Sequence, residues 1–203
     1  IDPDGRLDKV KPTSEEALQM IKNTLTEEDA QYVQLDDNGF IDADLLKKAK
    51  SNSGNLADLT ELVNDDKTYE VSVSTEFEYM TDGGDLIIRD MGDISYNDFF
   101  TGEPLDEAEG FKGVTQTPGN AAKKYNSKDD IVRIHVNKGL NNRDRARTFS
   151  HEAYGHAILY SRGKDHMHRV KSTSKGFVDT NKKLQRLINS AVNETEKNYN
   201  ARY

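Results

Sequence analysis

Residues 151–156, His-Glu-Ala-Tyr-Gly-His, are the types from which zinc hydrolases build their metal site. Two imidazoles from one helix can hold a metal ion, and a glutamate directly after the first can accept a proton from the water that the metal activates. We therefore predict that His151 and His156 are metal ligands, that Glu152 is the catalytic base and that the cofactor is Zn²⁺.

The spacing of these histidines predicts a distorted helix. In the familiar pattern H-E-x-x-H the histidines are four residues apart, which separates them by about 40° around an α-helix. His151 and His156 are five apart, or about 140° on a regular α-helix, which is too wide for one ion. We therefore predict a π-bulge in this segment, a feature that gathers at functional sites, with Gly155 supplying an adaptable backbone.

The pattern H-E-x-x-G-H resembles the zinc motif of the dipeptidyl peptidase III family, which has the same one-residue insertion. The resemblance covers this motif and a candidate third ligand, because 203 residues are far too few for that family's architecture. It implies a zinc metallopeptidase with a protein or peptide substrate.

A catalytic zinc site needs a third protein ligand. Asn193-Glu194, in the final predicted helix, resembles the second motif of thermolysin-like peptidases, whose Asn-Glu pair supplies a zinc-binding carboxylate. In that motif an Asp four residues further on orients a zinc-binding His. The resemblance implies Glu194 as the third ligand, with Asn198 in the place of that Asp. Positions i and i+4 share a helix face, so both can point at the motif helix.

Other ligands remain possible. Glu196 lies on the other flank of the same helix, and His166 or His168 would give a three-histidine site. We prefer for His166 the task of stabilising an oxyanion or protonating the leaving amine, for which Tyr154 and Tyr160 are further candidates.

These residues require a few elements to position them. Residues 69–79 and 131–136 read as strands, with residues 86–89 as a second strand of a hairpin, whereas residues 90–128 read as a long irregular connection. The motif helix runs from Asn141 or Asn142 to about Gly163, and a last helix begins near Asn181. The strand before the motif helix is also expected to bind extended substrate along its edge. His135, inside that strand, reads as structural.

The fold class that we predict is α+β, with a small, mostly antiparallel sheet packed on the zinc-motif helix and the C-terminal helix. We divide the chain into a junction segment (1–6), an N-terminal helical portion (7–66) and a metallopeptidase domain (67–203). The formal net charge of -8 disfavours nucleic acid and anionic membranes as partners. The absence of cysteine excludes thiolate ligands and disulfides. We expect a monomer.

Two further segments resemble parts of large exported bacterial proteins. Residues 1–6, Ile-Asp-Pro-Asp-Gly-Arg, resemble the closing segment of the RHS/YD-repeat core, and residues 130–160 resemble HExxGH-type C-terminal domains of RHS proteins. The resemblance implies a toxin or effector domain that is secreted or delivered from a larger protein and has a cognate immunity protein. Two alternatives stay open: a catalytically inactive partner-binding module, and a zinc hydrolase of a non-peptide amide.

Overall fold

The computed structural model describes residues 9–81, 83–97, 104–119, 126–173 and 176–203. The predicted junction at residues 1–6 lies outside the described residues. The architecture is α+β, as predicted from the sequence, and four of the six strand pairings are antiparallel.

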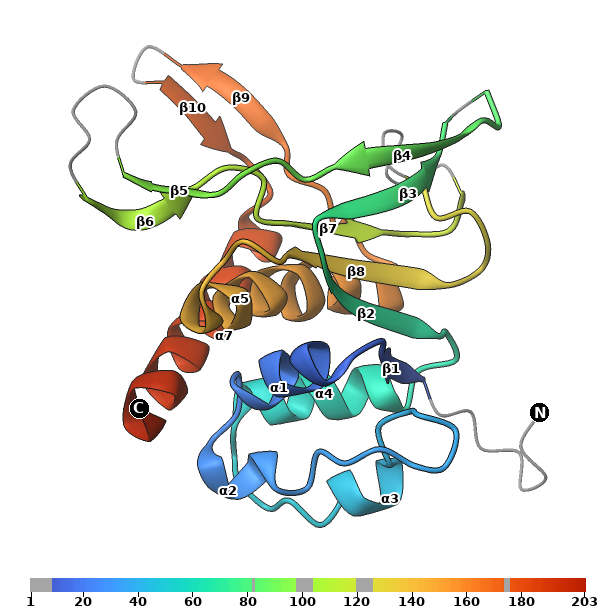
Figure 1. Cartoon of the computed structure of the whole chain (residues 1–203), viewed down its shortest axis with the longest axis vertical. Coiled ribbons are helices and arrows are strands. Elements are labelled where there is room, and N and C mark those ends of the chain that lie inside the picture. Colours follow the sequence, from blue (N-terminus) through green and yellow to red (C-terminus); the bar gives the residue numbers. More distant parts are fainter. Residues whose placement is uncertain (1–8, 82, 98–103, 120–125, 174–175) are drawn as a thin grey trace.

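A four-stranded sheet forms the centre of the molecule (Figure 1). Its strands are β1 (Val10–Pro12), β2 (Tyr69–Ser74), β7 (Gly113–Gln116) and β8 (Val132–Asn137), in the order β1-β2-β8-β7. The first three strands in this order run parallel, and β7 pairs antiparallel with β8. The strand that precedes the motif helix, β8, is therefore an inner strand, and β1 and β7 lie at the two edges of the sheet.

Successive side chains along each strand point to opposite faces of this sheet, so the two faces differ in composition. Val71 of β2 and Ile134 of β8 belong to the main hydrophobic core, on the helical side. The opposite face, which carries His135, meets the hairpin of β3 (Glu76–Met80) and β4 (Leu86–Asp90) and a small second core that includes Phe77. The single strand predicted for residues 69–79 is thus two strands, β2 and β3, which belong to different sheets.

Two more hairpins complete the β-structure. β5 (Ser95–Asn97) pairs with β6 (Pro104–Glu109), and β9 (Val170–Thr173) pairs with β10 (Gly176–Asp179). Strands β5, β6 and β7 fall within residues 90–128, so the prediction of an irregular connection there is wrong. Figure 1 shows the hairpins on the side of the sheet away from the N-terminal helices.

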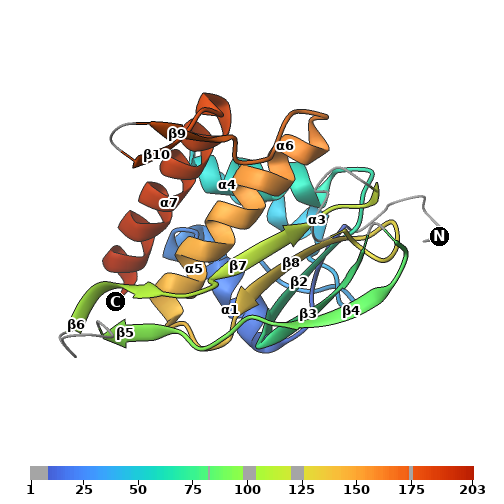
Figure 2. The ribbon, with the colours of Figure 1, turned by 90° about the horizontal axis from the view of Figure 1, so that it is seen from above.

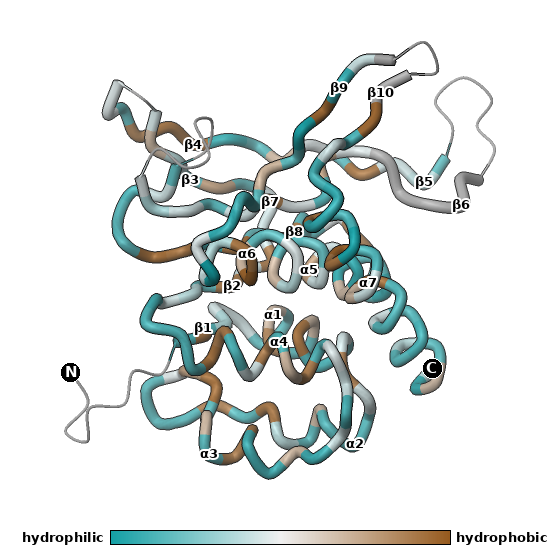
Figure 3. The backbone as a smooth tube through the Cα atoms, turned by 180° about the vertical axis from the view of Figure 1, so that it is seen from behind, coloured by the Kyte–Doolittle hydropathy of each residue, from teal (hydrophilic) through white to brown (hydrophobic). Residues whose placement is uncertain are grey.

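The N-terminal helices are α1 (Glu15–Lys22), α2 (Glu27–Ala30), α3 (Ala43–Leu46) and α4 (Gly54–Val63). They follow strand β1 and share one continuous hydrophobic core with the sheet and the later helices. Figure 3 shows this layout from behind, with α1 and α4 between the four-stranded sheet and the short helices α2 and α3. The N-terminal helical portion therefore packs as part of the same core as the predicted metallopeptidase domain.

The motif helix has three consecutive parts, α5 (Asn142–Ser150), the π-helix η2 (His151–Ala157) and α6 (Ile158–Ser161). Figure 2 shows them as one rod between α7 (Lys182–Arg202) and strand β7, and η2 contacts both of these elements. The rod carries its functional side chains between the sheet edge and the C-terminal helix.

Candidate metal centre

The π-bulge predicted from the five-residue spacing is confirmed, because residues 151–157 form a π-helix. In this helix the hydrogen bonds span five residues, so residues five apart come onto one face. The Nε2 atoms of His151 and His156 lie 3.2 Å apart. Local sequence spacing thus brings the first two ligand atoms together.

Gly155 has a packing role that the sequence alone did not reveal. A Cβ atom at this position would lie 2.5 Å from Cγ1 of Ile188 on α7. The π-helix and α7 therefore approach each other more closely than any larger residue permits. Gly113 of β7 is similar, since a Cβ there would lie 2.6 Å from Cγ2 of Thr148 and 3.1 Å from Cγ of Glu152.

His168 is the third member of the cluster. Its Nε2 atom lies 3.3 Å from Nε2 of His151, and one ligand atom from each of the three histidines falls within 4.8 Å of the others. His168 stands between the motif helix and β9 and was one of the alternatives left open by the sequence. The three imidazoles come from two turns of one helix and from the base of a hairpin.

Hydrogen bonds on the far side of two rings fix which nitrogen faces the cluster. Nδ1 of His156 lies 2.5 Å from the backbone oxygen of His166, and Nδ1 of His168 lies 2.7 Å from Oδ2 of Asp179. Both partners are acceptors, so these Nδ1 atoms carry the protons and the Nε2 lone pairs point inward. A cation between the three Nε2 atoms would accept a lone pair from each of them.

Asp179 is a site residue that sequence reasoning missed. It closes β10, and its Oδ1 atom also accepts hydrogen bonds from the backbone N–H groups of Arg169 and Asn181. The hydrogen bond with His168 lowers the pKa of Asp179 to about 2, so it is a carboxylate at neutral pH. Carboxylate–histidine pairing is the usual support of metal-binding imidazoles, but the sequence showed no sign that residues 168 and 179 meet.

Burial favours the neutral form of the other two histidines, His151 and His156. Removal from water lowers the pKa of both His151 and His156, and the nearby Glu152 carboxylate opposes this only in part. Both imidazoles are therefore neutral at neutral pH, the state in which histidine binds a metal ion.

Glu152 lies beside the cluster and is held by the edge strand. The hydroxyl of Thr115, in β7, lies 2.8 Å from Oε2 of Glu152 and 3.1 Å from its backbone oxygen. Only 8% of Glu152 is exposed. A buried carboxylate with a fixed direction, next to the first ligand, has the placement of a general base.

Glu194 is not in the cluster, so its assignment as the third ligand needs correction. Its carboxylate accepts hydrogen bonds from Ser53 Oγ at 2.5 Å, from the N–H of Gly54 at 3.1 Å and from the N–H of Asn55 at 3.3 Å. It therefore binds the first turn of α4, where N–H groups lack helical partners and a negative charge is favourable.

Asn198 and Glu196, predicted as the supporting residue and as an alternative ligand, also make other contacts. Asn198, expected to support a histidine, donates instead to the backbone oxygen of Thr24 at 3.0 Å. Glu196 forms an ion pair with Arg143. The resemblance to the second thermolysin motif therefore does not describe the contacts of this helix.

The assignments of His166 and Tyr154 as catalytic groups are also corrected. The His166 side chain packs edge-on against Tyr160, with ring centroids 5.3 Å apart, and only its backbone oxygen serves the site. Tyr154 is fully buried, and its hydroxyl lies 3.0 Å from Oγ1 of Thr24. On a π-helix that places residues 151 and 156 on one face, Tyr154 points into the core instead.

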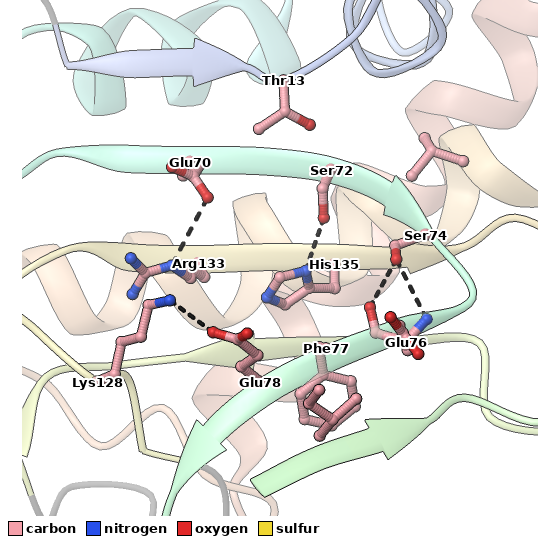
Figure 4. Close-up of a pocket in the computed structure, with 12 residues that line it drawn as sticks. Thr13, Glu70, Ser72, Ser74, Glu76, Phe77, Glu78, Lys128, Arg133 and His135 are labelled. Carbon is pink, nitrogen blue, oxygen red and sulfur yellow. Dashed lines mark hydrogen bonds and ion pairs between the residues drawn. The ribbon is translucent and has the colours of Figure 1, made fainter. Parts of the chain in front are cut away.

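His135 is structural, as expected. Its Nδ1 lies 2.6 Å from Ser72 Oγ, and its Nε2 lies 2.9 Å from Gln116 Oε1. It lines a cavity of about 390 Å³ between the sheet and the β3–β4 hairpin, on the face opposite the metal cluster (Figure 4). Figure 4 shows two ion pairs in this lining, Glu70–Arg133 and Glu78–Lys128. The cavity is thus lined largely by polar side chains that lie between the sheet and the hairpin.

A second cavity, of about 350 Å³, lies beside the three-histidine cluster. His151 and Glu152 form one wall, the segment 110–113 forms another, and Asp144, Arg147 and Thr148 of α5 line the rest with Val192 of α7. It is this cavity, and not the one in Figure 4, that communicates with the groups that can do chemistry.

The chain has no match among known proteins, whether family models, curated proteins or solved structures are compared. Among the helices that the structure describes, none has the length and apolar character needed to cross a membrane.

Proposed function

We propose that the protein is a zinc-dependent hydrolase of peptide bonds. The observation that carries this proposal is the convergence of three imidazole Nε2 atoms, at 3.2 and 3.3 Å from the central His151, with Glu152 next to that histidine. Three histidines with a neighbouring carboxylate form the ligand set and base of a catalytic zinc site that leaves one position for water.

The separations fit zinc. Two imidazole nitrogens bound to one tetrahedral zinc at about 2.0–2.1 Å lie about 3.3 Å from each other. The two distances from His151, 3.2 Å to Nε2 of His156 and 3.3 Å to Nε2 of His168, agree with this value. Neutral nitrogen ligands with a supporting carboxylate suit this ion. His151, His156 and His168 would therefore hold the metal.

Residues of the chain would perform the proton transfer and orient the ligands. Zinc, when bound, supplies a Lewis acid that polarises a carbonyl and makes water acidic. Glu152, directed by Thr115, accepts the proton from the attacking water and delivers it to the leaving amine. Asp179 and the backbone oxygen of His166 keep His168 and His156 in the ligating orientation.

The edge strand favours an extended peptide as substrate. β7 is at the end of the strand order, and its Thr115 touches the proposed base. A peptide that adds to this edge would pass the metal cluster with its backbone held by main-chain hydrogen bonds. The sequence-based expectation of edge pairing thus applies to β7 rather than to the inner strand β8.

Metal content and peptidase activity test the proposal together. Wild type should hold one zinc per chain and cleave a mixed peptide library, and Glu152→Gln should keep the zinc but lose activity by roughly a hundredfold or more. His168→Ala should lose the zinc, whereas the matched variant His166→Phe, two residues away, should retain it. Full activity of Glu152→Gln would contradict the proposal.

The same measurements separate the alternatives. Zinc without cleavage of any peptide, but with hydrolysis of simple amides, would indicate a non-peptide substrate. A chain that binds no metal and is fully stable would be a non-enzymatic binding module. The proposal predicts neither result.

We also propose that the domain acts as a delivered bacterial effector with a cognate immunity protein. The support is the resemblance of residues 1–6 and 130–160 to RHS-associated domains. Expression in a bacterial cytoplasm should then arrest growth for wild type and not for Glu152→Gln. Equal growth of both strains at equal protein levels would contradict this role.

A further inference from the structure

Strand β4 carries three consecutive apolar side chains that are exposed to solvent. Leu86, Ile87 and Ile88 are 52%, 40% and 60% exposed, and every residue of the strand is exposed. Elsewhere in the described part of the chain the exposed large apolar residues stand singly. Single exposed apolar residues are ordinary, whereas a run of them on a sheet edge marks a surface that pairs with another strand.

The outer edge of β4 has no partner strand among the described residues, because β4 pairs with β3 alone in a two-stranded sheet. At one end of the hairpin the N–H of Thr81 donates to the backbone oxygen of Asp85 at 2.9 Å. At the other end the N–H of Met91 donates to the backbone oxygen of Thr75 at 2.8 Å. Hydrogen-bonded and non-bonded pairs alternate along an antiparallel ladder, so the odd-numbered residues of β4 direct their backbone groups toward β3.

The even-numbered residues of β4 direct their backbone groups away from β3. Leu86 and Ile88, the two most exposed of the three apolar residues, therefore present their N–H and C=O groups at the open edge. No residue that the structure describes forms a backbone hydrogen bond with these groups. Another β-strand can bond to them without any change in the hairpin.

The sequence of β4 is complementary to a second copy of itself. In a two-fold antiparallel pair, residues with outward backbone groups must lie opposite one another, which restricts the register. With Ile87 on the two-fold axis, Leu86 of each copy lies opposite Ile88 of the other, so apolar residues face apolar residues at three successive positions. Asp85 then lies opposite Arg89 of the other copy, so unlike formal charges meet at both ends. This register requires no ion pair between them, only that like charges do not meet.

The neighbouring registers lack this complementarity. With Ile88 on the axis, Leu86 would lie opposite Asp90. With Leu86 on the axis, Ile88 would lie opposite Gly84, and with Arg89 on the axis two arginines would meet. Because cross-strand neighbours stabilise a sheet when they match and destabilise it when like charges meet, the register centred on Ile87 is favoured.

We propose that two copies of the chain form a dimer through antiparallel pairing of their β4 strands in the register centred on Ile87. The two β3–β4 hairpins then form one four-stranded sheet, which removes an open edge from each copy. The hairpin meets the sheet face that carries His135, opposite the metal cluster, so this pairing leaves both clusters accessible. The contact is small, so the dimer dissociates on dilution, and the monomer expected from the sequence is the form at low concentration.

Sedimentation velocity of the full chain over a range of concentrations tests the dimer. The sedimentation coefficient of wild type should rise from the monomer value toward the dimer value as the concentration increases. Leu86→Glu and Ile88→Lys should each remain monomeric, because each places a charge opposite an apolar side chain. Val178→Lys, which alters an exposed apolar residue of the β9–β10 hairpin, is the matched control and should dimerise like wild type.

An equimolar mixture of Leu86→Glu and Ile88→Lys tests the register. In the proposed register residue 86 of one copy faces residue 88 of the other, so the introduced glutamate and lysine meet and a heterodimer should form. In the register centred on Ile88 the two introduced charges do not meet. A mixture that stays monomeric therefore overturns the proposed register.

Amide hydrogen exchange of wild type gives a reading that does not depend on the folding of a variant. Higher concentration should slow exchange at the N–H groups of Leu86 and Ile88 and leave that of Ile87, which faces β3, unchanged. Exchange that is independent of concentration at all three contradicts the pairing. The dimer itself is overturned if wild type is monomeric at every concentration, if both β4 variants still dimerise, or if Val178→Lys also abolishes association. These outcomes do not depend on zinc binding or on peptidase activity.

Discussion

The orientation of His168 depends on a single carboxylate. Oδ2 of Asp179 accepts a hydrogen bond from Nδ1 of His168, while Oδ1 accepts hydrogen bonds from two backbone N–H groups. This arrangement holds the ring with Nε2 toward His151. His168 is itself partly exposed, with 42% of its side chain accessible, so burial alone would not fix the ring.

We predict that Asp179→Asn weakens zinc binding by about 10–100-fold while leaving the fold intact. The amide oxygen can keep the backbone contacts, but the charged acceptor for His168 is lost. Competition with a chelating dye measures the affinity, and Asp165→Asn, which removes an exposed partner of Arg169 on the same loop, is the control. An unchanged affinity in Asp179→Asn would show that the hydrogen bond does not support the site.

Glu194 should affect stability and not metal binding. Its carboxylate binds the first turn of α4 through Ser53, Gly54 and Asn55. Glu194→Gln removes the charge from this contact, so we predict a loss of about 1–2 kcal/mol in the free energy of unfolding, with zinc affinity unchanged. Urea denaturation of the metal-free proteins gives the first quantity and dye competition the second. A loss of zinc affinity with normal stability would restore Glu194 as a ligand.

Site residues could be predicted from the sequence where they lie close together along the chain. His151, Glu152 and His156 fall within six residues, so their types indicated the chemistry and their spacing indicated the π-helix. His168 and Glu194 had to be ranked as third ligands by analogy, and the structure places His168, which was ranked lower, beside His151, and Glu194 at the first turn of α4. Which of them reaches the motif helix depends on how hairpin β9–β10 and helix α7 pack, and short motifs do not encode that packing.

At the scale of elements, the π-helix and α7 fit because Gly155 lacks a side chain. We predict that Gly155→Ala lowers the free energy of unfolding by about 1–3 kcal/mol, since its Cβ would overlap Cγ1 of Ile188. The same substitution in an Ile188→Ala background should cost clearly less, because the overlapping atom is gone. Additive effects in this double-mutant cycle would mean that the two positions do not interact.

The interface between the sheet and the β3–β4 hairpin should respond to acid through His135. Burial, aided by the charge of Arg133, lowers the pKa of His135 from 6.5 to about 4. Below pH 6.5 the unfolded chain binds a proton that the folded chain accepts only near pH 4. The stability contributed by the neutral ring is therefore present above pH 6.5 and is lost as the pH falls toward 4, with a slope of up to about 1.4 kcal/mol per pH unit.

This acid sensitivity can be isolated with one variant. The difference in free energy of unfolding between wild type and His135→Asn should shrink steadily from pH 6.5 to pH 4 and be constant above pH 7. Urea denaturation across this range measures it, and the other histidines cancel because both proteins contain them. A difference independent of pH would contradict a buried neutral His135.

Helices and strands could be predicted where apolar residues recur with a clear helical or strand period. The α+β class, the motif helix and the C-terminal helix followed from apolar stripes and alternation. Strand β7 did not, because its four residues, Gly-Val-Thr-Gln, lie in a Gly-, Asp- and Asn-rich region and are held by pairing with β8. That pairing is a tertiary contact, so a local pattern could not show that β7 forms the sheet edge beside the site.

At the scale of the whole molecule, one core joins the two ends of the chain. Residues from Val10 to Ala191 share this core, and α4 contacts both α7 and the π-helix. The N-terminal helices thus support the helices that carry or flank the metal cluster. Since the three histidines come from the motif helix and from the base of the β9–β10 hairpin, a metal ion bound to them in the folded state should stabilise the chain against unfolding.

We propose that three histidines, and no carboxylate, hold one zinc ion. X-ray absorption at the zinc edge, on protein loaded with one equivalent of metal, measures this most directly. We predict three imidazole nitrogens at about 2.0–2.1 Å and one non-imidazole oxygen, the same set of ligands in Glu194→Ala, and no bound zinc in His168→Ala. Two imidazoles with a protein carboxylate that disappears in Glu194→Ala, or no specific zinc site at all, would contradict the account.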